Sequence, residues 1–568
     1  MDQKVDQAAR AKRLLPSCGW PARNRIFAAF CVTMVVLLFA AGLGWRDLWK
    51  PDEPRVAGIA AEMARTGDWI VPRLNGKPFL EKPPLYLWGV AASFRIFGET
   101  AGVARATSVL AAIAAVFLVF HFSRRLGSSQ SGALMAAVVL GTSANFWDVG
   151  RRCLPDMQLA LCIGAAMYCC YEAVHAARHR WLWVLGYSGA LAAGMMTKGL
   201  VAVAIPLLAL GCWFLWSRQR SVHAWLCLGG GVALALIPVC AWLFALWQAQ
   251  GWDTVYTVVW TNNIGRFTGS HPEHIAPFHY YLVKFPGQFL PWALFIPAAV
   301  KEWRRRWRGQ EDKDPLRFLL CWFFAPLLLL SLSAGKRGVY LVPLYPAAAM
   351  LVAPGITVAL ARSKAVTKWG TIPLTFLSFA LPVGAVSAVV FSMQSGQLTP
   401  FAIVSSTALA AAGTWACVAV VQRNWPAVAV RLPLATVIAF AVFGMVVQPL
   451  LNDRSSYRSL LHEVEATAGP YADICLYKPS ERLLGAAVFY LGHSVRVTHN
   501  LARLTDPGVV GVIRAEGWTS APPAGEVEWE AASKHFLVIS AAIGEVTPVV
   551  AEDEEKRTQE TVPEQAWD

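Results

Sequence analysis

The sequence has little charge for its length, and this scarcity excludes a water-soluble fold. Only 15% of its 568 residues are charged, whereas 56% are hydrophobic and 25 are Trp. A soluble domain carries roughly 25% charged residues, so most of this chain is adapted to a solvent other than water. The net charge of +14 does not indicate nucleic-acid binding, because the basic residues lie in short segments between apolar runs. That distribution is typical of a polytopic membrane protein.

Several familiar motifs are also missing from the sequence. No glycine-rich phosphate loop is present, so the sequence indicates no nucleotide-binding domain. The 12 Cys include no CxxC or Cys/His zinc spacing and lie mostly inside apolar segments, which argues against a disulfide framework. No repeat of the solenoid type is found, so a stacked-repeat architecture is excluded as well.

Apolar segments of about 20 residues, long enough to cross a bilayer, recur along the chain. We expect an all-α polytopic bundle of about thirteen transmembrane helices. A shorter apolar segment at 85–97 is expected either to re-enter the membrane or to pack beside the second span. The expected spans are 26–44, 101–122, 131–147, 155–174, 181–196, 199–217, 223–248, 281–300, 316–334, 339–360, 371–393, 400–421 and 430–450.

Lys and Arg near the ends of these spans predict the orientation. With thirteen spans and a cytoplasmic N-terminus, every inside connection is basic, including the run 301–308. After the last span, short β-rich runs separated by Pro, Gly and charged segments predict a small outer α/β domain. The predicted domains are a basic cytoplasmic N-terminus at 1–25, the membrane bundle at 26–450, a periplasmic α/β domain at 451–545 and a disordered acidic tail at 546–568.

Two outer loops, 45–83 and 249–280, carry charges at the membrane surface, where ionisable groups indicate function when they converge. The first loop predicts a juxtamembrane helix that starts near Pro54, a residue suited to the first helical position. Its apolar residues recur at helical spacing, so we expect the helix to lie flat on the outer membrane surface. The apolar stripe consists of Val56, Ile59, Ala60 and Met63.

The charged residues at the two ends of this loop have competing interpretations. Glu53 is expected at the cap position of the helix, which leaves Asp52 just outside it. Either both residues serve only to start the helix, or Asp52 is a carboxylate that faces a reaction centre. Lys82 is either an interfacial anchor or a phosphate ligand. Pro83 favours the second role, because it restricts the preceding residue to an extended backbone.

Other outer turns add further charges. Asp156 lies at the mouth of the fourth span, Lys198 lies in a tight turn, and Lys336 and Arg337 precede the tenth span. Arg266 lies in the second outer loop. Short basic turns on the outside oppose the usual charge rule, so these cations are expected to bind an anionic ligand, with phospholipid headgroups as the alternative.

A divalent metal site is a further hypothesis. Glu81, His271 and His274 lie on the two outer loops and offer suitable ligand atoms, but their spacing fits no fixed motif. Solvated loop histidines are the alternative interpretation.

The motifs of the first outer loop resemble those of a known family. They are Trp49-Lys-Pro-Asp-Glu-Pro-Arg55, Gly67-Asp-Trp-Ile-Val-Pro72, Asn75-Gly76 and Glu81-Lys-Pro-Pro84. They are similar to the first outer loop of bacterial 4-amino-4-deoxy-arabinose transferases, which belong with protein O-mannosyltransferases to the GT-C class. The resemblance continues in order over roughly residues 40–350, through Asp156, Thr197-Lys-Gly199, Leu290-Pro-Trp292, Gly335–Tyr340 and Leu344-Tyr-Pro346.

One turn departs from the family pattern. Ala334-Gly-Lys-Arg337 replaces the Ser-Lys-rich turn that is common before the tenth helix, and this leaves the sugar and the acceptor open.

This resemblance implies a GT-C fold and an inverting glycosyl transfer at the outer face of the bacterial inner membrane. The implied donor is a polyprenyl-phosphate sugar, and the acceptor is lipid A, another envelope glycan or a protein. Membrane lipids are the other expected partners, with no nucleic acid and no required cofactor. The implied catalytic residues are Asp52, Asp156 and Glu53, and the implied phosphate ligands are Lys82, Arg55, Arg266, Lys336, Arg337 and Lys198.

Other functions compete with this interpretation. Within the enzymes, a protein O-mannosyltransferase-like activity or transfer to another envelope glycan remains open. A lipid-linked substrate transporter or flippase would place polar residues near span midpoints and broken helices in paired repeats. Here the unusual charges gather at one predicted membrane face, which favours the enzyme.

Overall fold

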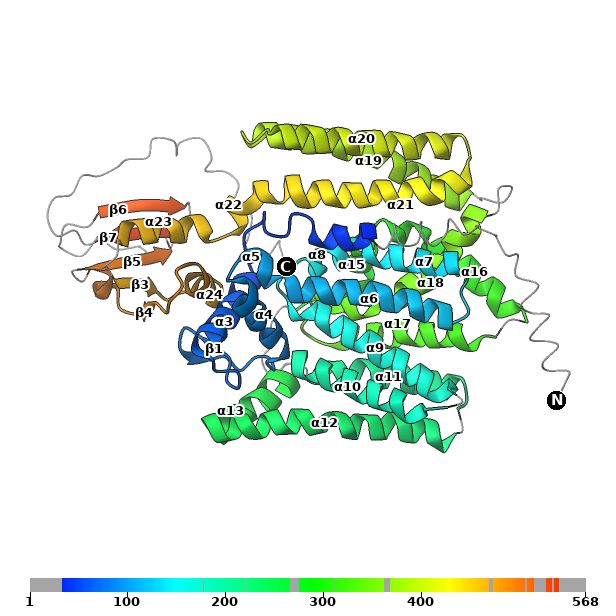
Figure 1. Ribbon diagram of the computed structural model, residues 1–568, viewed down its shortest axis with the longest axis horizontal. Coiled ribbons are helices and arrows are strands. Elements are labelled where there is room, and N and C mark those ends of the chain that lie inside the picture. Colours follow the sequence, from blue (N-terminus) through cyan, green and yellow to red (C-terminus); the bar gives the residue numbers. More distant parts are fainter. Residues whose placement is uncertain are drawn as a thin grey trace.

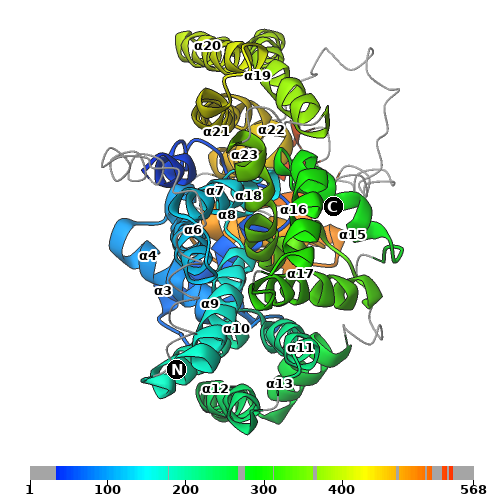
Figure 2. The ribbon, with the colours of Figure 1, turned by 90° about the vertical axis from the view of Figure 1, so that its right-hand side faces the viewer.

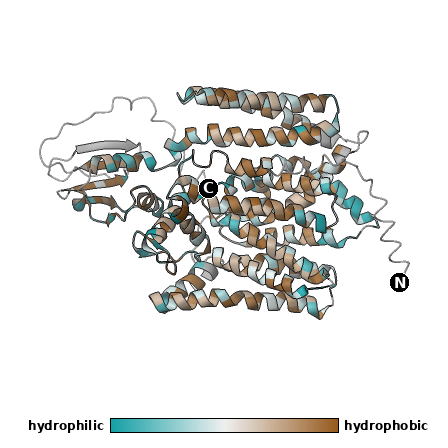
Figure 3. Cartoon of the chain, viewed as in Figure 1, coloured by the Kyte–Doolittle hydropathy of each residue, from teal (hydrophilic) through white to brown (hydrophobic). Residues whose placement is uncertain are grey.

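A computed structural model describes residues 33–176, 178–219, 221–265, 275–310, 312–361, 368–468, 473–505, 508–514, 528–533 and 536–540. Long helices run side by side to form a bundle, and a small domain that contains the β-strands stands at one end of it (Figure 1). Hydrophobic residues cover the long helices (Figure 3). The predicted class, a polytopic helical bundle with a small C-terminal α/β domain, is confirmed.

The long helices of the bundle follow the predicted apolar segments closely. A helix satisfies its backbone hydrogen bonds internally, as a membrane requires, and the hydrophobic side chains on these helices suit a lipid environment. They are α6 (Ala106–Arg125), α9 (Pro155–His175), α10 (Arg180–Lys198), α11 (Val201–Trp216), α12 (Val222–Gln250), α17 (Asp314–Leu332), α18 (Tyr345–Ala361), α19 (Lys368–Gln394), α20 (Pro400–Val421) and α21 (Trp425–Val442).

The number of spans stays a prediction. Within the described part of the chain, eight helices are long and apolar enough to cross a membrane. A ninth is added if α7 (Gln130–Gly141) and α8 (Ala144–Gly150), bent by 65° at the break between them, form one span. The first predicted span, 26–44, lies partly outside the described residues.

One predicted span has a different form. The prediction of a single helix at 281–300 is wrong. The structure has α15 (Tyr280–Gln288), a short 3₁₀ turn and then α16 (Ile296–Arg308) in this region. Pro291 lies at the break between them. Proline lacks the backbone N–H that would continue the helix, so the chain changes direction there.

The first outer loop folds into a compact layer between the bundle and the small domain (Figure 1). It contains α3 (Glu53–Thr66), the short strands β1 (Arg73–Leu74) and β2 (Lys77–Pro78), and α4 (Leu85–Phe97). The predicted short apolar helix at 85–97 is confirmed, and it packs beside α6, where the Tyr86 hydroxyl lies 2.7 Å from that of Ser108.

The apolar stripe of α3 does not face lipid, and the orientation of α3 relative to the membrane surface stays a prediction. Every residue from Glu53 to Ala64 except Arg55 is buried, because α3 lies between α4 and α24 (Glu481–Tyr490) of the small domain. A Cβ atom at Gly58 would come within 2.4 Å of the Gly485 carbonyl oxygen. The apolar stripe of α3 therefore packs against protein, and glycine at both positions allows the close helix crossing.

The small domain contains a five-stranded sheet with the order β4-β3-β5-β7-β6. The first three strands in this order are parallel, and β7 pairs antiparallel with both β5 and β6. Helices α23 (Arg458–Ala468) and α24 share an apolar core with the sheet. The strands are β3 (Asp473–Tyr477), β4 (Arg496–Thr498), β5 (Val509–Arg514), β6 (Glu528–Ser533) and β7 (Phe536–Ser540); the predicted tail at 546–568 lies outside the described residues.

Candidate active site

Asp52 occupies the cap position of α3, and not Glu53 as the sequence predicted, but its side chain makes no capping hydrogen bond. Its carboxylate instead accepts hydrogen bonds from Arg337 at 2.5 Å and from Arg55 at 3.2 Å. Asp52 is only 8% exposed. Burial alone would raise its pKa, but the charges of Arg337, Lys82 and Arg55 outweigh burial and hold the pKa of Asp52 well below its usual range.

Lys82 follows β2 and lines a small pocket together with Arg55, Phe79, Tyr86 and Thr197. The pKa of Lys82 is lowered to about 8, mainly by burial and also by the nearby cations Arg55 and Lys198, against the opposing charges of Asp52 and Glu81. Within the described residues Lys82 has neither an ion pair nor a hydrogen bond of its side chain. Its ammonium group is therefore available for an anionic ligand.

Arg55 connects three carboxylates from different parts of the chain. Its guanidinium lies 3.2 Å from Asp52, 3.4 Å from Glu81 and 2.7 Å from Glu481 of the small domain. Burial lowers the pKa of Arg55, but these carboxylates outweigh it and leave the pKa above its usual value. Arg55 thus stays charged and links Asp52 to Glu481 of the small domain.

The second predicted carboxylate reaches the same region from the bundle. Asp156 lies in the first turn of α9, where Pro155 starts the helix, and it forms an ion pair with Lys198 in the last turn of α10. The Lys198 ammonium also lies over the ring of Tyr340, 4.5 Å from its centre. Asp156 is close enough to Arg337 to raise the pKa of that arginine, together with Asp52. The structure therefore brings Asp52, Lys82 and Asp156 together at one end of the bundle.

Glu53 has a different environment, although it is the next residue after Asp52. It is 2% exposed and pairs with Arg105 at 2.8 Å and Arg46 at 3.2 Å. The backbone N–H groups of Trp49 and Cys153 donate to it as well. Burial raises its pKa, but the two arginines outweigh burial and hold the pKa at about 2. Both carboxylate oxygens are thus engaged within the protein.

One predicted phosphate ligand, Lys336, turns away from the cluster, and another, Arg266, is not described. Lys336 is buried and donates to the backbone carbonyl oxygens of Ala276 at 2.8 Å and Ser333 at 2.5 Å. Its charge therefore fixes the turn before α18. Arg266 lies outside the described residues.

The predicted metal site is described only in part. Glu81 lies beside Arg55, whereas His271 and His274 fall outside the described residues. In the part of the chain that the structure covers, no group of three or more His, Cys, Asp or Glu side chains is arranged to hold a metal.

Sequence reasoning missed three charged residues that the structure brings into this region. Arg46 and Arg105 bind Glu53, and Glu481 binds Arg55. The signal for Arg105 was available, because it is a single charge at the start of a long apolar segment. No local pattern distinguishes Glu481 from the other surface carboxylates of the small domain.

Parts of this chain are similar in sequence to known glycosyltransferases. A family model described as dolichyl-phosphate-mannose-protein mannosyltransferase matches residues 81–242. The undecaprenyl phosphate-alpha-4-amino-4-deoxy-L-arabinose arabinosyl transferase of Erwinia tasmaniensis is 33% identical over 348 residues, covering 60% of this chain and 61% of that protein. The protein of the same name from Edwardsiella ictaluri is 34% identical, covering 56% of this chain and 57% of that protein. The similarity thus spans about three fifths of the length of these relatives.

Solved structures extend the similarity to nearly the whole chain. The crystal structure of ArnT from Cupriavidus metallidurans bound to undecaprenyl phosphate matches with a TM-score of 0.76 at 19% identity, covering 93% of this chain and all of that one. Its apo state matches with a TM-score of 0.71. The resemblance inferred from the outer-loop motifs is therefore confirmed, and the chain has the ArnT-like GT-C fold.

Proposed function

We propose that this protein is an inverting glycosyltransferase of the bacterial inner membrane. It transfers 4-amino-4-deoxy-L-arabinose, or a related sugar, from a polyprenyl-phosphate donor to lipid A on the periplasmic side. The observation that carries the proposal is the cluster of Asp52 with Lys82, Arg55 and Arg337 at one end of an ArnT-like bundle. The names of the relatives, and the undecaprenyl phosphate bound in the crystal structure of ArnT, support the choice of donor and sugar.

The chemistry of such a donor explains why cations are needed. When the bond between the sugar and the phosphate breaks, negative charge develops on the departing polyprenyl phosphate. Lys82 and Arg337 lie beside Asp52 and can stabilise this charge by preorganised electrostatics. Lys82 suits the role best, because its ammonium has no ion pair within the described residues.

The electrostatics of Asp52 bear on the acceptor. A general base works best when its pKa lies near the operating pH, whereas the pKa of Asp52 is held well below its usual range by Arg337, Lys82 and Arg55. A hydroxyl acceptor would need a stronger base than this carboxylate. A phosphate acceptor, as in lipid A, is already anionic and needs no base, so transfer to lipid A does not require Asp52 to accept a proton.

In this scheme the carboxylates act on the sugar. Asp52 stays ionised and stabilises the positive charge that develops on the sugar ring, or pairs with the sugar amine. Asp156, held by Lys198, orients the sugar from the side of the bundle. The ion pairs of Arg55 with Asp52 and with Glu81 hold Asp52 close to the turn that contains Lys82.

The proposal is tested by mass spectrometry of lipid A and other envelope glycans from a strain that lacks the gene. Complementation with the wild-type gene should restore the addition of aminoarabinose to lipid A, and complementation with the Asp52→Asn gene should not. Unchanged lipid A together with an altered envelope glycan or glycoprotein would reject lipid A as the acceptor. If no glycan changed at all, the transferase proposal itself would fall.

A further inference from the structure

Helix α16 (Ile296–Arg308) lies at the end of the bundle opposite the small domain and therefore opposite the Asp52 cluster (Figure 1). Viewed from that end, α16 lies beside α18 (Figure 2). It has five cationic residues and one acidic residue within its last eight positions. Such a concentration of positive charge raises the question of what neutralises it.

One side of α16 packs against α18. A Cβ atom at Gly355 of α18 would come within 2.6 Å of the Ala299 backbone nitrogen, so the two helices touch closely. Trp303 donates to the Leu351 carbonyl oxygen at 2.8 Å. The buried carboxylate of Glu302 accepts from Arg305 at 2.8 Å and from Arg306 at 3.0 Å. Glu302 therefore pairs with two of the five cations, and one of these, Arg305, also lines the pocket described next.

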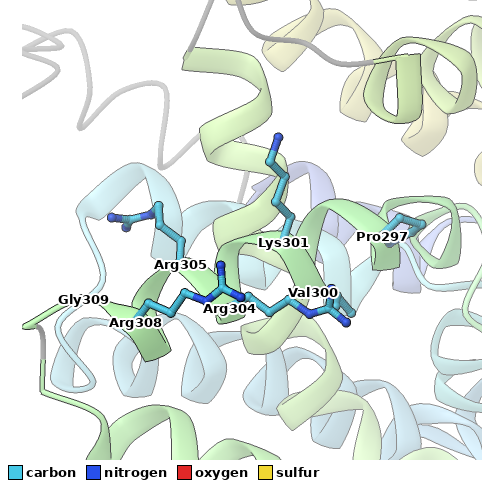
Figure 4. A pocket seen from close by; sticks show the side chains of 7 residues that line it. All are labelled: Pro297, Val300, Lys301, Arg304, Arg305, Arg308 and Gly309. Carbon is cyan, nitrogen blue, oxygen red and sulfur yellow. The ribbon is translucent and has the colours of Figure 1, made fainter.

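The other side of α16 opens into a pocket of about 610 Å³. Figure 4 shows its cationic side chains projecting from the helix. Pro297 and Val300 line the pocket towards the beginning of the helix, and the cations line it towards the end. The pocket is lined by Pro297, Val300, Lys301, Arg304, Arg305, Arg308 and Gly309.

Three of these cations have no ion-pair partner in the part of the chain that the structure describes. Within the described residues no carboxylate pairs with Lys301, Arg304 or Arg308, whereas Glu302 on the packed side is engaged by Arg305 and Arg306. Like charges three and four positions apart on a helix destabilise it. An anion bound in the pocket would remove this repulsion.

Aromatic residues mark the level of the pocket relative to the membrane. Trp307 lies 5.5 Å from Trp216 of α11, measured between ring centres, and both side chains are partly exposed. The guanidinium of Arg317 lies 5.6 Å from the centre of the Trp307 ring. Trp residues that accompany cations are typical of the interface between the hydrocarbon core and the headgroups. The basic end of α16 therefore lies at headgroup level, and its apolar beginning lies deeper.

We propose that this pocket binds the headgroup of an anionic phospholipid, in the leaflet opposite the Asp52 site. Lys301, Arg304 and Arg308 contact the phosphate, and Pro297 and Val300 contact the upper part of an acyl chain. All of the residues that line this pocket belong to α16 or to Gly309, which follows it, and clustered Lys and Arg side chains beside apolar residues are the chemistry that recognises such lipids. The site is separate from the proposed transfer reaction and does not depend on it.

The test is native mass spectrometry of the full-length protein in detergent, titrated with phosphatidylglycerol or with phosphatidylcholine. Wild-type protein should retain phosphatidylglycerol in preference to phosphatidylcholine. The variant Lys301→Gln/Arg304→Gln/Arg308→Gln should lose phosphatidylglycerol affinity by more than ~10-fold. All three side chains are exposed, so the variant is expected to fold, which size-exclusion chromatography checks.

A matched control removes the same charge elsewhere at this end of the bundle. Arg124→Gln/Arg180→Gln/Arg423→Gln changes three other exposed arginines and should keep the preference for phosphatidylglycerol. Equal losses in the two triple variants would overturn the proposal, because they would show that general positive charge attracts the lipid. Equal retention of the two lipids by the wild-type protein would overturn it as well.

Discussion

Asp52 and Glu53 are consecutive carboxylates with opposite environments. Glu53 is held by two arginines and two backbone N–H groups, which engage both of its carboxylate oxygens. Asp52 pairs with Arg337 and Arg55 and lies close to Lys82, a cation that lines a pocket and has no ion pair within the described residues. A buried charge whose partners are all satisfied holds a fold together, whereas a cluster with an unused cation is prepared for a ligand.

The largest expected effect comes from breaking the Glu53 cluster. Glu53→Ala leaves Arg46 and Arg105 buried without their partner, and removal of one member of a buried ion pair costs roughly 3–5 kcal/mol. We expect a sharp fall in membrane expression and in the melting temperature of the purified protein. A well-folded Glu53→Ala protein that had lost only activity would contradict the structural role assigned to Glu53.

Asp52→Asn should give the opposite pattern. The amide keeps the shape and one acceptor oxygen but removes the charge that faces the sugar, so transfer should fall by about 10²-fold or more. Folding should change less than in Glu53→Ala, because Arg55 retains Glu81 and Glu481 as partners and the amide oxygen can still accept a hydrogen bond from Arg337, which is partly exposed. Transfer assays with a polyprenyl-phosphate sugar and thermal melting measure both properties. Near-normal transfer would remove Asp52 from the mechanism.

The charge of Lys82 should make the transfer activity depend on pH. Because burial lowers the pKa of Lys82 to about 8, the ammonium is charged below that pH and loses its charge as the pH rises through it. If this charge stabilises the leaving phosphate, kcat/KM should decline above about pH 8.

Lys82→Arg provides the matched control for this decline, since arginine stays charged to much higher pH. The variant should have lower activity but a flat profile through pH 8. A decline that persisted unchanged in Lys82→Arg would assign the titration to another group.

The smallest effect is expected for the contact between the two domains. Glu481 is about half exposed, and an exposed ion pair contributes about 0–1 kcal/mol. Glu481→Gln should therefore reduce transfer by no more than about 5-fold. Arg458→Gln, which removes another contact of the small domain, with Asp47, serves as the control. Complete loss of activity in Glu481→Gln would show that Arg55 depends on the small domain far more than its other two carboxylates suggest.

The sequence predicted much of the candidate site because charges are rare in this chain and lie at predicted turns. Asp52, Lys82, Asp156, Lys198 and Arg337 were all identified in this way, and the structure brings them together; their roles in the reaction stay proposals. The direction of each side chain could not be predicted. Lys336 is adjacent to Arg337 in sequence, yet it turns to backbone carbonyl groups while Arg337 reaches Asp52.

The sequence alone determined that the chain forms a helical membrane bundle, where most of its helices lie and which family its first outer loop resembles. These properties depend on local hydrophobic runs and short motifs. Tertiary structure alone decided that α3 is buried beneath α24, that Glu53 is locked between Arg46 and Arg105, and that Glu481 reaches Arg55 across 426 positions. Pairing between such distant charges is set by how helices pack, because ionic contacts need side chains within a few ångströms of each other, and no local pattern encodes that separation.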